Sequence, residues 1–125
     1  MTVYLDAEDL IEIAGIVLGG TPRVRDHGLL ASAVVRPATV VLGREAYPDL
    51  WHKAAALLHS VCMNHALIDG NKRLAWAAAR VFLAHNGVPL HDVDVDAAEA
   101  FVLAVAAGEL TEVADIGRRL RQLYP

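Results

Sequence analysis

Apolar residues recur every three or four positions over most of this chain, which is the spacing of helices that bury one face. The pattern predicts six helices, at about residues 6–18, 26–35, 48–65, 70–85, 96–107 and 111–124. Asp6, Asp96 and Thr111 are the expected N-cap residues, because their side chains can accept hydrogen bonds from the free N–H groups of a first helical turn. Pro48 suits the first turn of the longest helix.

The helical spacing breaks in residues 39–47. Thr39, Val40 and Val41 are β-branched and a polar turn containing Gly43 follows, so this segment is expected to form a short extended flap. No repeat, low-complexity tract or linker divides the 125 residues. The predicted fold is therefore all-α: a single domain, residues 1–125, built as a compact helical bundle with a short extended flap before the long central helix.

Composition and charge narrow the class of ligand. Hydrophobic residues make up 55% of the chain and its net charge at pH 7 is −4, so the chain as a whole does not attract nucleic acid or anionic lipid. Direct DNA binding is not expected, and any phosphate ligand must be held locally. Cys62 is the sole cysteine and is interpreted as a small buried residue in a reducing compartment. The N-terminus lacks the features of a signal peptide and no apolar run is long enough to span a membrane, so a soluble cytoplasmic protein is expected.

The candidate chemistry is concentrated in residues 65–73, His-Ala-Leu-Ile-Asp-Gly-Asn-Lys-Arg, between two predicted helices. The first turn of a helix offers free N–H groups and a positive dipole end, so Gly70, Asn71 and Lys72 are predicted to bind a phosphate chain. Lys72 and Arg73 add permanent charge, and Arg73 can bind phosphate oxygens through two parallel hydrogen bonds.

Two further residues of this segment complete a nucleotide site. Asp69 directly precedes the turn and is the candidate ligand for a Mg²⁺ ion that bridges phosphate oxygens. His65 ends the preceding helix, and a histidine can accept a proton from an attacking hydroxyl, so it is the candidate general base. A nucleotide and Mg²⁺ are the ligands that this set of side chains indicates.

Each of these residues also has a purely structural interpretation. A histidine at a helix end can cap carbonyl groups, Asp-Gly-Asn can be a connecting turn, and Lys-Arg can be a solvated helix start. A basic pair in a first turn, however, opposes the helix dipole, where acidic residues would be stabilising. That conflict favours a bound anion.

The pattern His-x-x-x-Asp-Gly-Asn-Lys-Arg resembles the signature of the Fic/Doc superfamily, in its Doc (death on curing) toxin form. The likeness extends to residues 25–30, 36–37, 82–87 and 106–110, and so covers nearly the whole chain. The resemblance implies an all-α Fic core, with a flap that docks the target by strand addition. The reaction it implies is transfer of the γ-phosphate of ATP to a threonine of elongation factor Tu, which stops protein synthesis.

Departures from the family pattern help to choose the reaction. Fic enzymes that transfer AMP continue their motif as Gly-Asn-Gly-Arg-x-x-Arg, whereas here Lys72 replaces the second glycine and Trp76 stands at the second arginine. The lysine would crowd an anion cradle built for glycine, and the missing arginine removes a phosphate clamp. Leu67 replaces the usual aromatic residue but keeps an apolar anchor. A kinase-type phosphotransferase is therefore expected; the alternatives are a Fic-type AMP transferase and a catalytically silent binding module.

The family also uses an inhibitory Ser/Thr-x-x-x-Glu-Gly/Asn helix, and no such segment occurs here. We therefore expect inhibition by a separate protein, a small antitoxin whose Phd-like C-terminal segment folds into a groove of this protein.

Other residues receive less weight. His52, His59 and His65 lack the i, i+4 spacing of a helical metal site, and Trp51 and Trp76 are expected to be core aromatics.

Overall fold

The computed structural model describes all 125 residues and consists of six α-helices and one short hairpin. The helices are α1 (Ala7–Leu18), α2 (His27–Val35), α3 (Leu50–Asn64), α4 (Asn71–His85), α5 (Val95–Ala106) and α6 (Val113–Leu123). A single 3₁₀ turn (Arg36–Ala38) follows α2, and the strands β1 (Val40–Val41) and β2 (Arg44–Glu45) come next. The predicted all-α bundle with an extended flap before the long helix is therefore confirmed.

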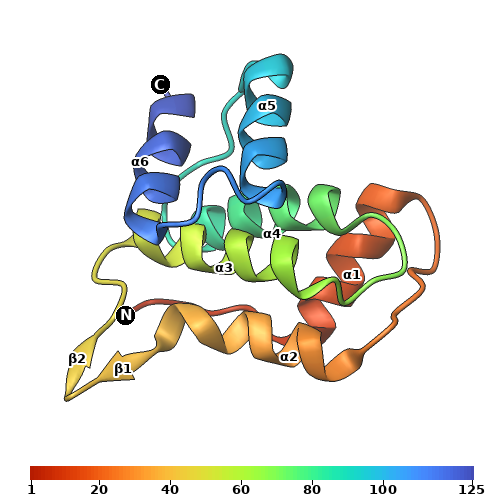
Figure 1. Cartoon of the computed structure of the whole chain (residues 1–125), viewed down its shortest axis with the longest axis horizontal. Helices are drawn as coiled ribbons and strands as arrows, with labels where there is room; N and C mark the ends of the chain where they lie inside the picture. The colour runs from red at the N-terminus through yellow and green to blue at the C-terminus, as the bar shows by residue number, and fades with distance from the viewer.

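Helices α3 and α4 form the centre of the fold (Figure 1). Helix α3 also packs against α2 and, more extensively, against α6, while α1 packs against α4. The buried faces of α3 and α4 are rich in alanine, including Ala54, Ala55, Ala75 and Ala78, all of which are fully buried. Because interaxial distance depends on side-chain size at the contact, small residues of this kind allow neighbouring helices to pack closely.

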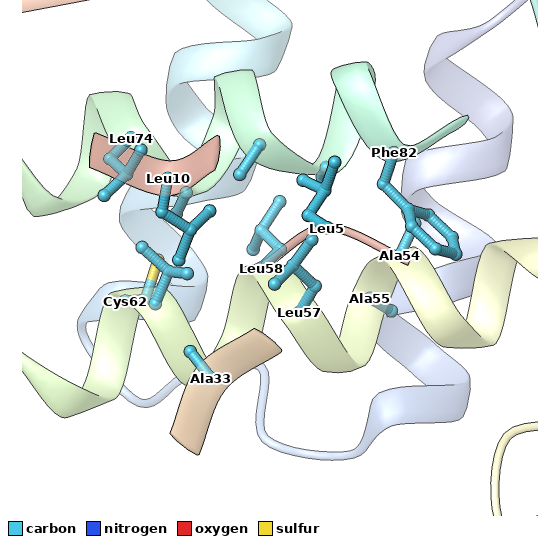
Figure 2. Close-up of a cluster of buried hydrophobic side chains, with 14 of the residues drawn as sticks. Leu5, Leu10, Ala33, Ala54, Ala55, Leu57, Leu58, Cys62, Leu74 and Phe82 are labelled. Atoms are coloured by element: carbon cyan, nitrogen blue, oxygen red, sulfur yellow. The ribbon is translucent and has the colours of Figure 1, made fainter. Parts of the chain in front are cut away.

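Larger apolar side chains fill the space around this central pair (Figure 2). Leu10 from α1, Leu57 and Leu58 from α3, and Leu74 and Phe82 from α4 are almost completely buried. Burial of this kind is the main favourable term in folding. It also fixes the ends of α3 and α4, between which the candidate site lies.

Three helix starts agree with the sequence, at Asp6, Asp26 and Gly70, and three do not. Asp6 forms a capping box with Asp9, as its N-cap role predicted. The prediction of Pro48 in the first turn of α3 was wrong, because the Asp49 carboxylate accepts a hydrogen bond from the His52 N–H and caps the helix. The other two corrections concern α5 and α6. Asp94, not Asp96, caps α5, and α6 starts after Glu112, so Thr111 lies outside it.

The flap is a two-stranded hairpin in which Val40 pairs with Glu45 and Val41 with Arg44. Its two turn residues, Leu42 and Gly43, both have positive φ angles. This is the backbone geometry that matches the twist of a tight hairpin. The flap is therefore a defined structural element.

Lys53, one turn into α3, ties the hairpin to the helix. Its ammonium group is buried and donates to the Glu45 carboxylate at 2.9 Å and to the Tyr47 carbonyl at 2.7 Å. Burial alone would lower the pKa of Lys53, but the hydrogen bonds and charges of Glu45 and Tyr4 outweigh it and raise the pKa. A charged Lys53 therefore fixes the hairpin at the N-terminal end of α3.

None of the helices combines the length and the apolar character that a membrane-spanning helix requires.

Candidate active site

The six predicted site residues lie at one junction, where the chain leaves α3 and enters α4. His65 is the C-cap residue of α3, with φ 52° and ψ 47°, and Gly70 is the N-cap residue of α4, with φ 90°. Positive φ is strained for histidine and free of cost for glycine. Two left-handed residues therefore turn the chain sharply between the helices.

Glycine is favoured at this turn for a second reason. A Cβ atom placed on Gly70 would lie 2.6 Å from Cδ2 and 2.7 Å from Cδ1 of Leu18, at the end of α1. These distances are shorter than any ordinary carbon–carbon contact. The end of α1 therefore packs directly against the turn that starts α4.

Arg25 holds the strained end of α3. Its Nε donates to the His65 carbonyl oxygen at 2.8 Å, and its Nη2 donates to the same carbonyl and to the Asn64 carbonyl oxygen at 3.2 Å. A cationic side chain at a helix C-terminus satisfies free carbonyls and interacts favourably with the dipole. Arg25 was part of the family resemblance, but nothing in the sequence indicated this role, since the partners lie about 40 residues away.

Backbone hydrogen bonds join the same two segments. The N–H groups of Arg25 and Asp26 both donate to the Ala66 carbonyl, at 2.7 and 3.1 Å, and the Ile68 N–H donates to the Arg23 carbonyl at 2.9 Å. Between them, Val24 and Leu67 form an antiparallel β-bridge. The segment ahead of α2 is therefore hydrogen-bonded to the site loop and holds it in place.

Leu67 and Asn71 fix the interior of the loop. The Leu67 side chain is buried, so it serves as an apolar anchor at the position where the family usually has an aromatic residue. The Asn71 amide accepts from the Leu67 N–H at 3.0 Å and donates to the Leu67 carbonyl at 2.9 Å. Because both ends of the amide are engaged, Asn71 contributes to the shape of the loop, and its backbone N–H is the group left for a ligand.

The start of α4 is strongly electropositive. No side chain caps it, and its first turn contains no acidic residue. Lys72 and Arg73 are exposed there, and neither forms an ion pair. Free N–H groups, the helix dipole and two cations therefore point to an anion at this position.

Asp69 and His65 are also exposed beside this turn. One carboxylate oxygen of Asp69 accepts from the Gly70 N–H at 2.9 Å, and the other has no partner. No group of three or more potential ligands comes together for a metal ion. A single carboxylate nonetheless fits Mg²⁺ that arrives with a nucleotide, since this ion takes one or two carboxylates together with phosphate oxygens and waters.

Two hollows border the start of α4. A small polar cavity of about 160 Å³ lies between it and the loop after α1, and Asp69 and Arg73 line it. A larger groove of about 500 Å³ runs between α4 and α5 and is mainly apolar. Lys72 and Arg73 line the end of this groove, so Arg73 belongs to both hollows.

Trp76 forms part of that groove and is only partly buried. Its ring packs edge-to-face on Phe101 of α5, with centroids 6.4 Å apart, and the Arg80 guanidinium lies over it. The prediction of a core aromatic is therefore only partly right, because Trp76 is partly buried and also lines the groove.

The remaining histidines have separate surroundings. The His52 ring bonds to Asp49 at 2.7 Å, and the His59 Nδ1 lies 2.6 Å from an Arg36 guanidinium nitrogen. Burial lowers the pKa of His59, and the Arg36 charge lowers it further. Arg36 also donates to Ser60 and to the Tyr47 hydroxyl. This cluster braces the base of the hairpin.

Cys62 is buried, as predicted, and burial raises the pKa of its thiol to about 11, with a small opposing effect from Lys72.

Comparison with known proteins agrees with these observations. The model of the Fic/DOC family matches residues 4–83. The chain is 58% identical over 107 residues to "Toxin Doc" of Mycolicibacterium smegmatis, which covers 85% of this chain and 82% of that protein. It is 34% identical over 124 residues to "Protein kinase doc" of Escherichia phage P1, which covers 97% of this chain and 95% of that protein.

Proposed function

Because this chain belongs to the Fic/DOC family, we propose that it is a Doc-type toxin that transfers the γ-phosphate of ATP to a threonine of elongation factor Tu and so inhibits protein synthesis. One similar protein is named as a toxin and another as a protein kinase. The observation that carries the proposal is the α3–α4 junction, where an exposed histidine and an exposed carboxylate adjoin an uncapped, basic helix start.

His65 acts as the general base. Its imidazole accepts the proton of the target hydroxyl as that oxygen attacks the γ-phosphorus, and ADP leaves. The side chain is exposed, so a protein substrate can reach it. The bonds from Arg25 to the His65 carbonyl fix the backbone from which the imidazole projects.

The start of α4 stabilises the charge that spreads over the transferring phosphoryl group. Lys72 and Arg73 supply two cations, and the first N–H groups of the helix supply fixed dipoles. Gly70 and the Asn71 amide shape the turn that presents these groups. Asp69 would hold Mg²⁺ through its free carboxylate oxygen, and the ion would neutralise phosphate charge.

Two positions favour phosphoryl transfer over AMP transfer. Lys72 stands exposed in the turn where AMP-transferring relatives have a glycine. Trp76 stands where they have a second arginine, and its ring packs against Phe101. A phosphate clamp at that position is therefore replaced by an apolar contact.

The hairpin remains a candidate docking element for the target. Its valines and Leu42 are exposed, as expected of an edge that pairs with another chain. It lies at the opposite end of α3 from His65, however, and the 15 residues of that helix span roughly 22 Å. A target bound along the hairpin would therefore have to bridge that distance to place a threonine at His65.

The apolar groove is the proposed binding site of a Phd-like antitoxin segment. Three basic side chains, Lys72, Arg73 and Arg80, line it against a single acidic one, Glu99. An amphipathic segment with apolar residues facing Val102 and Leu103 and with acidic residues near Lys72 would complement it. Such a segment would also compete with the nucleotide for the same cations.

A labelling assay tests the reaction. The protein is incubated with elongation factor Tu and with ATP labelled at either the α- or the γ-phosphate. Transfer of the γ-label is expected; transfer of the α-label would instead establish AMP transfer, and no transfer of either label would favour a silent binding module. His65→Ala and Asp69→Ala should abolish transfer, whereas His85→Ala, at the far end of α4, should not.

A second experiment tests whether the antitoxin segment binds in this groove. Leu103 is exposed in the groove and Leu90 is exposed outside it. In cells that produce the antitoxin encoded beside this chain, Leu103→Arg should restore toxicity and Leu90→Arg should not. Equal neutralisation of both variants by the antitoxin would exclude the groove as its binding site.

A further inference from the structure

Arg23, which lies outside the motif of residues 65–73, lines a polar cavity beside that motif. The loop between α1 and α2 forms one wall, through Thr21, Pro22 and Arg23, and Asp69 and Arg73 form the other. The cavity volume is about 160 Å³. This is enough for one phosphate group with a few waters and is well below the roughly 300 Å³ at which pockets for whole organic ligands begin.

The two walls are fixed to each other. The Arg23 carbonyl accepts the Ile68 N–H at 2.9 Å, and the neighbouring Val24 forms a bridge with Leu67. Behind them, the Leu18 side chain packs so closely against Gly70 that an added Cβ would have to displace it. Arg23 is therefore held beside the motif by its backbone, which leaves its side chain available for another purpose.

The charges that line the cavity are not balanced within the protein. Neither Arg23 nor Arg73 forms an ion pair or donates a side-chain hydrogen bond, although 26 hydrogen bonds involving side chains and three ion pairs occur elsewhere. Asp69 shares the cavity but is not paired with either guanidinium. The guanidinium charges of Arg23 and Arg73 repel each other, and the Arg73 charge also opposes the dipole at the start of α4. A bound anion would remove both costs.

We propose that Arg23 is a further phosphate ligand of the nucleotide, and that this cavity holds one phosphate group between the guanidinium groups of Arg23 and Arg73. A guanidinium matches phosphate oxygens with two parallel hydrogen bonds, so two of them can clamp one group from opposite walls. Asp69 then lies where Mg²⁺ would contact the same phosphate chain. This inference rests on the proposed function, because it takes the ligand of the site to be a nucleotide.

Calorimetric titration of the purified protein tests the proposal, with MgATP and with magnesium tripolyphosphate as probes. Arg23→Gln should weaken binding of both probes roughly tenfold, as expected for the loss of a charge-assisted hydrogen bond. It should also raise KM for ATP with little change in kcat. Arg23→Lys should recover part of the affinity. The matched control is Arg119→Gln, since Arg119 is an exposed arginine on α6.

Each outcome bears on the inference. Wild-type affinity of Arg23→Gln for both probes would overturn it, even if the wild-type protein transfers the γ-label. Failure of the wild-type protein to bind either probe would overturn it together with the proposed function. If tripolyphosphate binds in an Arg23-dependent way but no label is transferred, the phosphate site stands and the proposed reaction fails.

Discussion

Substitution of Gly70 by alanine tests how the end of α1 positions the start of α4. Two separate costs are expected. The first is a backbone cost, because φ is 90° at Gly70 and an L-residue is strained there. The second is a packing cost, because the new Cβ would lie 2.6 Å from the Leu18 side chain.

The magnitudes follow from these two terms. The left-handed backbone costs about 1–2 kcal/mol, offset by about 0.4–1 kcal/mol because alanine restricts the unfolded chain. Overpacking costs about 1–3 kcal/mol, toward the lower end here because the Leu18 methyl groups are the movable end of a side chain. The free energy of unfolding should therefore fall by about 1–3 kcal/mol.

Urea unfolding of four variants separates the terms. Gly108 has φ 80° and nothing within 4 Å of an added Cβ, so Gly108→Ala measures the backbone term alone. Gly70→Ala in a Leu18→Ala background has room for the new methyl group. The difference between Gly70→Ala in the two backgrounds, corrected by Leu18→Ala itself, measures the packing term.

The packing term should disappear in the Leu18→Ala background, and Gly70→Ala should then resemble Gly108→Ala. Gly70→Ala should also reduce label transfer, because a shift of the turn moves the first N–H groups of α4 away from the phosphate. An additive double mutant, or a Gly70→Ala protein as stable as Gly108→Ala, would refute the contact between Leu18 and the turn as the reason for glycine.

Three other predictions concern residues that support the site. Arg25→Ala should lower kcat by about 10- to 100-fold, because the His65 carbonyl loses the hydrogen bonds that position the residue. The MgATP dissociation constant measured by calorimetry should stay near the wild-type value. Lys53→Met should lower the free energy of unfolding by about 1–3 kcal/mol, because the Tyr47 carbonyl loses its hydrogen-bond donor, and hydrogen exchange in residues 40–45 should rise; unchanged exchange would contradict the anchoring role. The pKa of His59 is lowered from 6.5 in the folded protein. Neutral His59 therefore makes its full contribution to the free energy of unfolding above about pH 6.5, and this contribution is lost as the pH falls through the pKa of the folded protein. His59→Asn, which keeps an acceptor for Arg36, should lose less stability than wild type between pH 7.5 and 5 in urea titrations, and an equal loss would exclude His59 as the cause.

Much of the fold could be predicted because its signals are local. Helical spacing of apolar residues and the Asp6 capping box are read within a few positions of the sequence. The errors at Pro48, Asp96 and Thr111 arose where several capping residues stand close together, since which one caps depends on the geometry of the whole turn. Asp49 and Asp94 were the neighbours that the structure selected.

The site divides in the same way. The motif from His65 to Arg73 is contiguous, so its chemistry can be read directly from the sequence. The residues that hold it are distant: Arg25 acts across 40 positions, and Arg23 faces Asp69 and Arg73 only because of the bridge between Val24 and Leu67. No periodicity or composition signal connects such pairs.

The two hollows beside α4 would couple the proposed phosphate site to the proposed antitoxin groove. Arg73 lines both the polar cavity and the apolar groove, and Lys72 lines the groove. A partner carboxylate placed in the groove would neutralise these cations, and the same cations must be free to bind phosphate. Inhibitor and nucleotide would then weaken each other's binding by the same factor, as linkage requires. If the proposed antitoxin binds in this groove, it would therefore act on the phosphate site through Lys72 and Arg73.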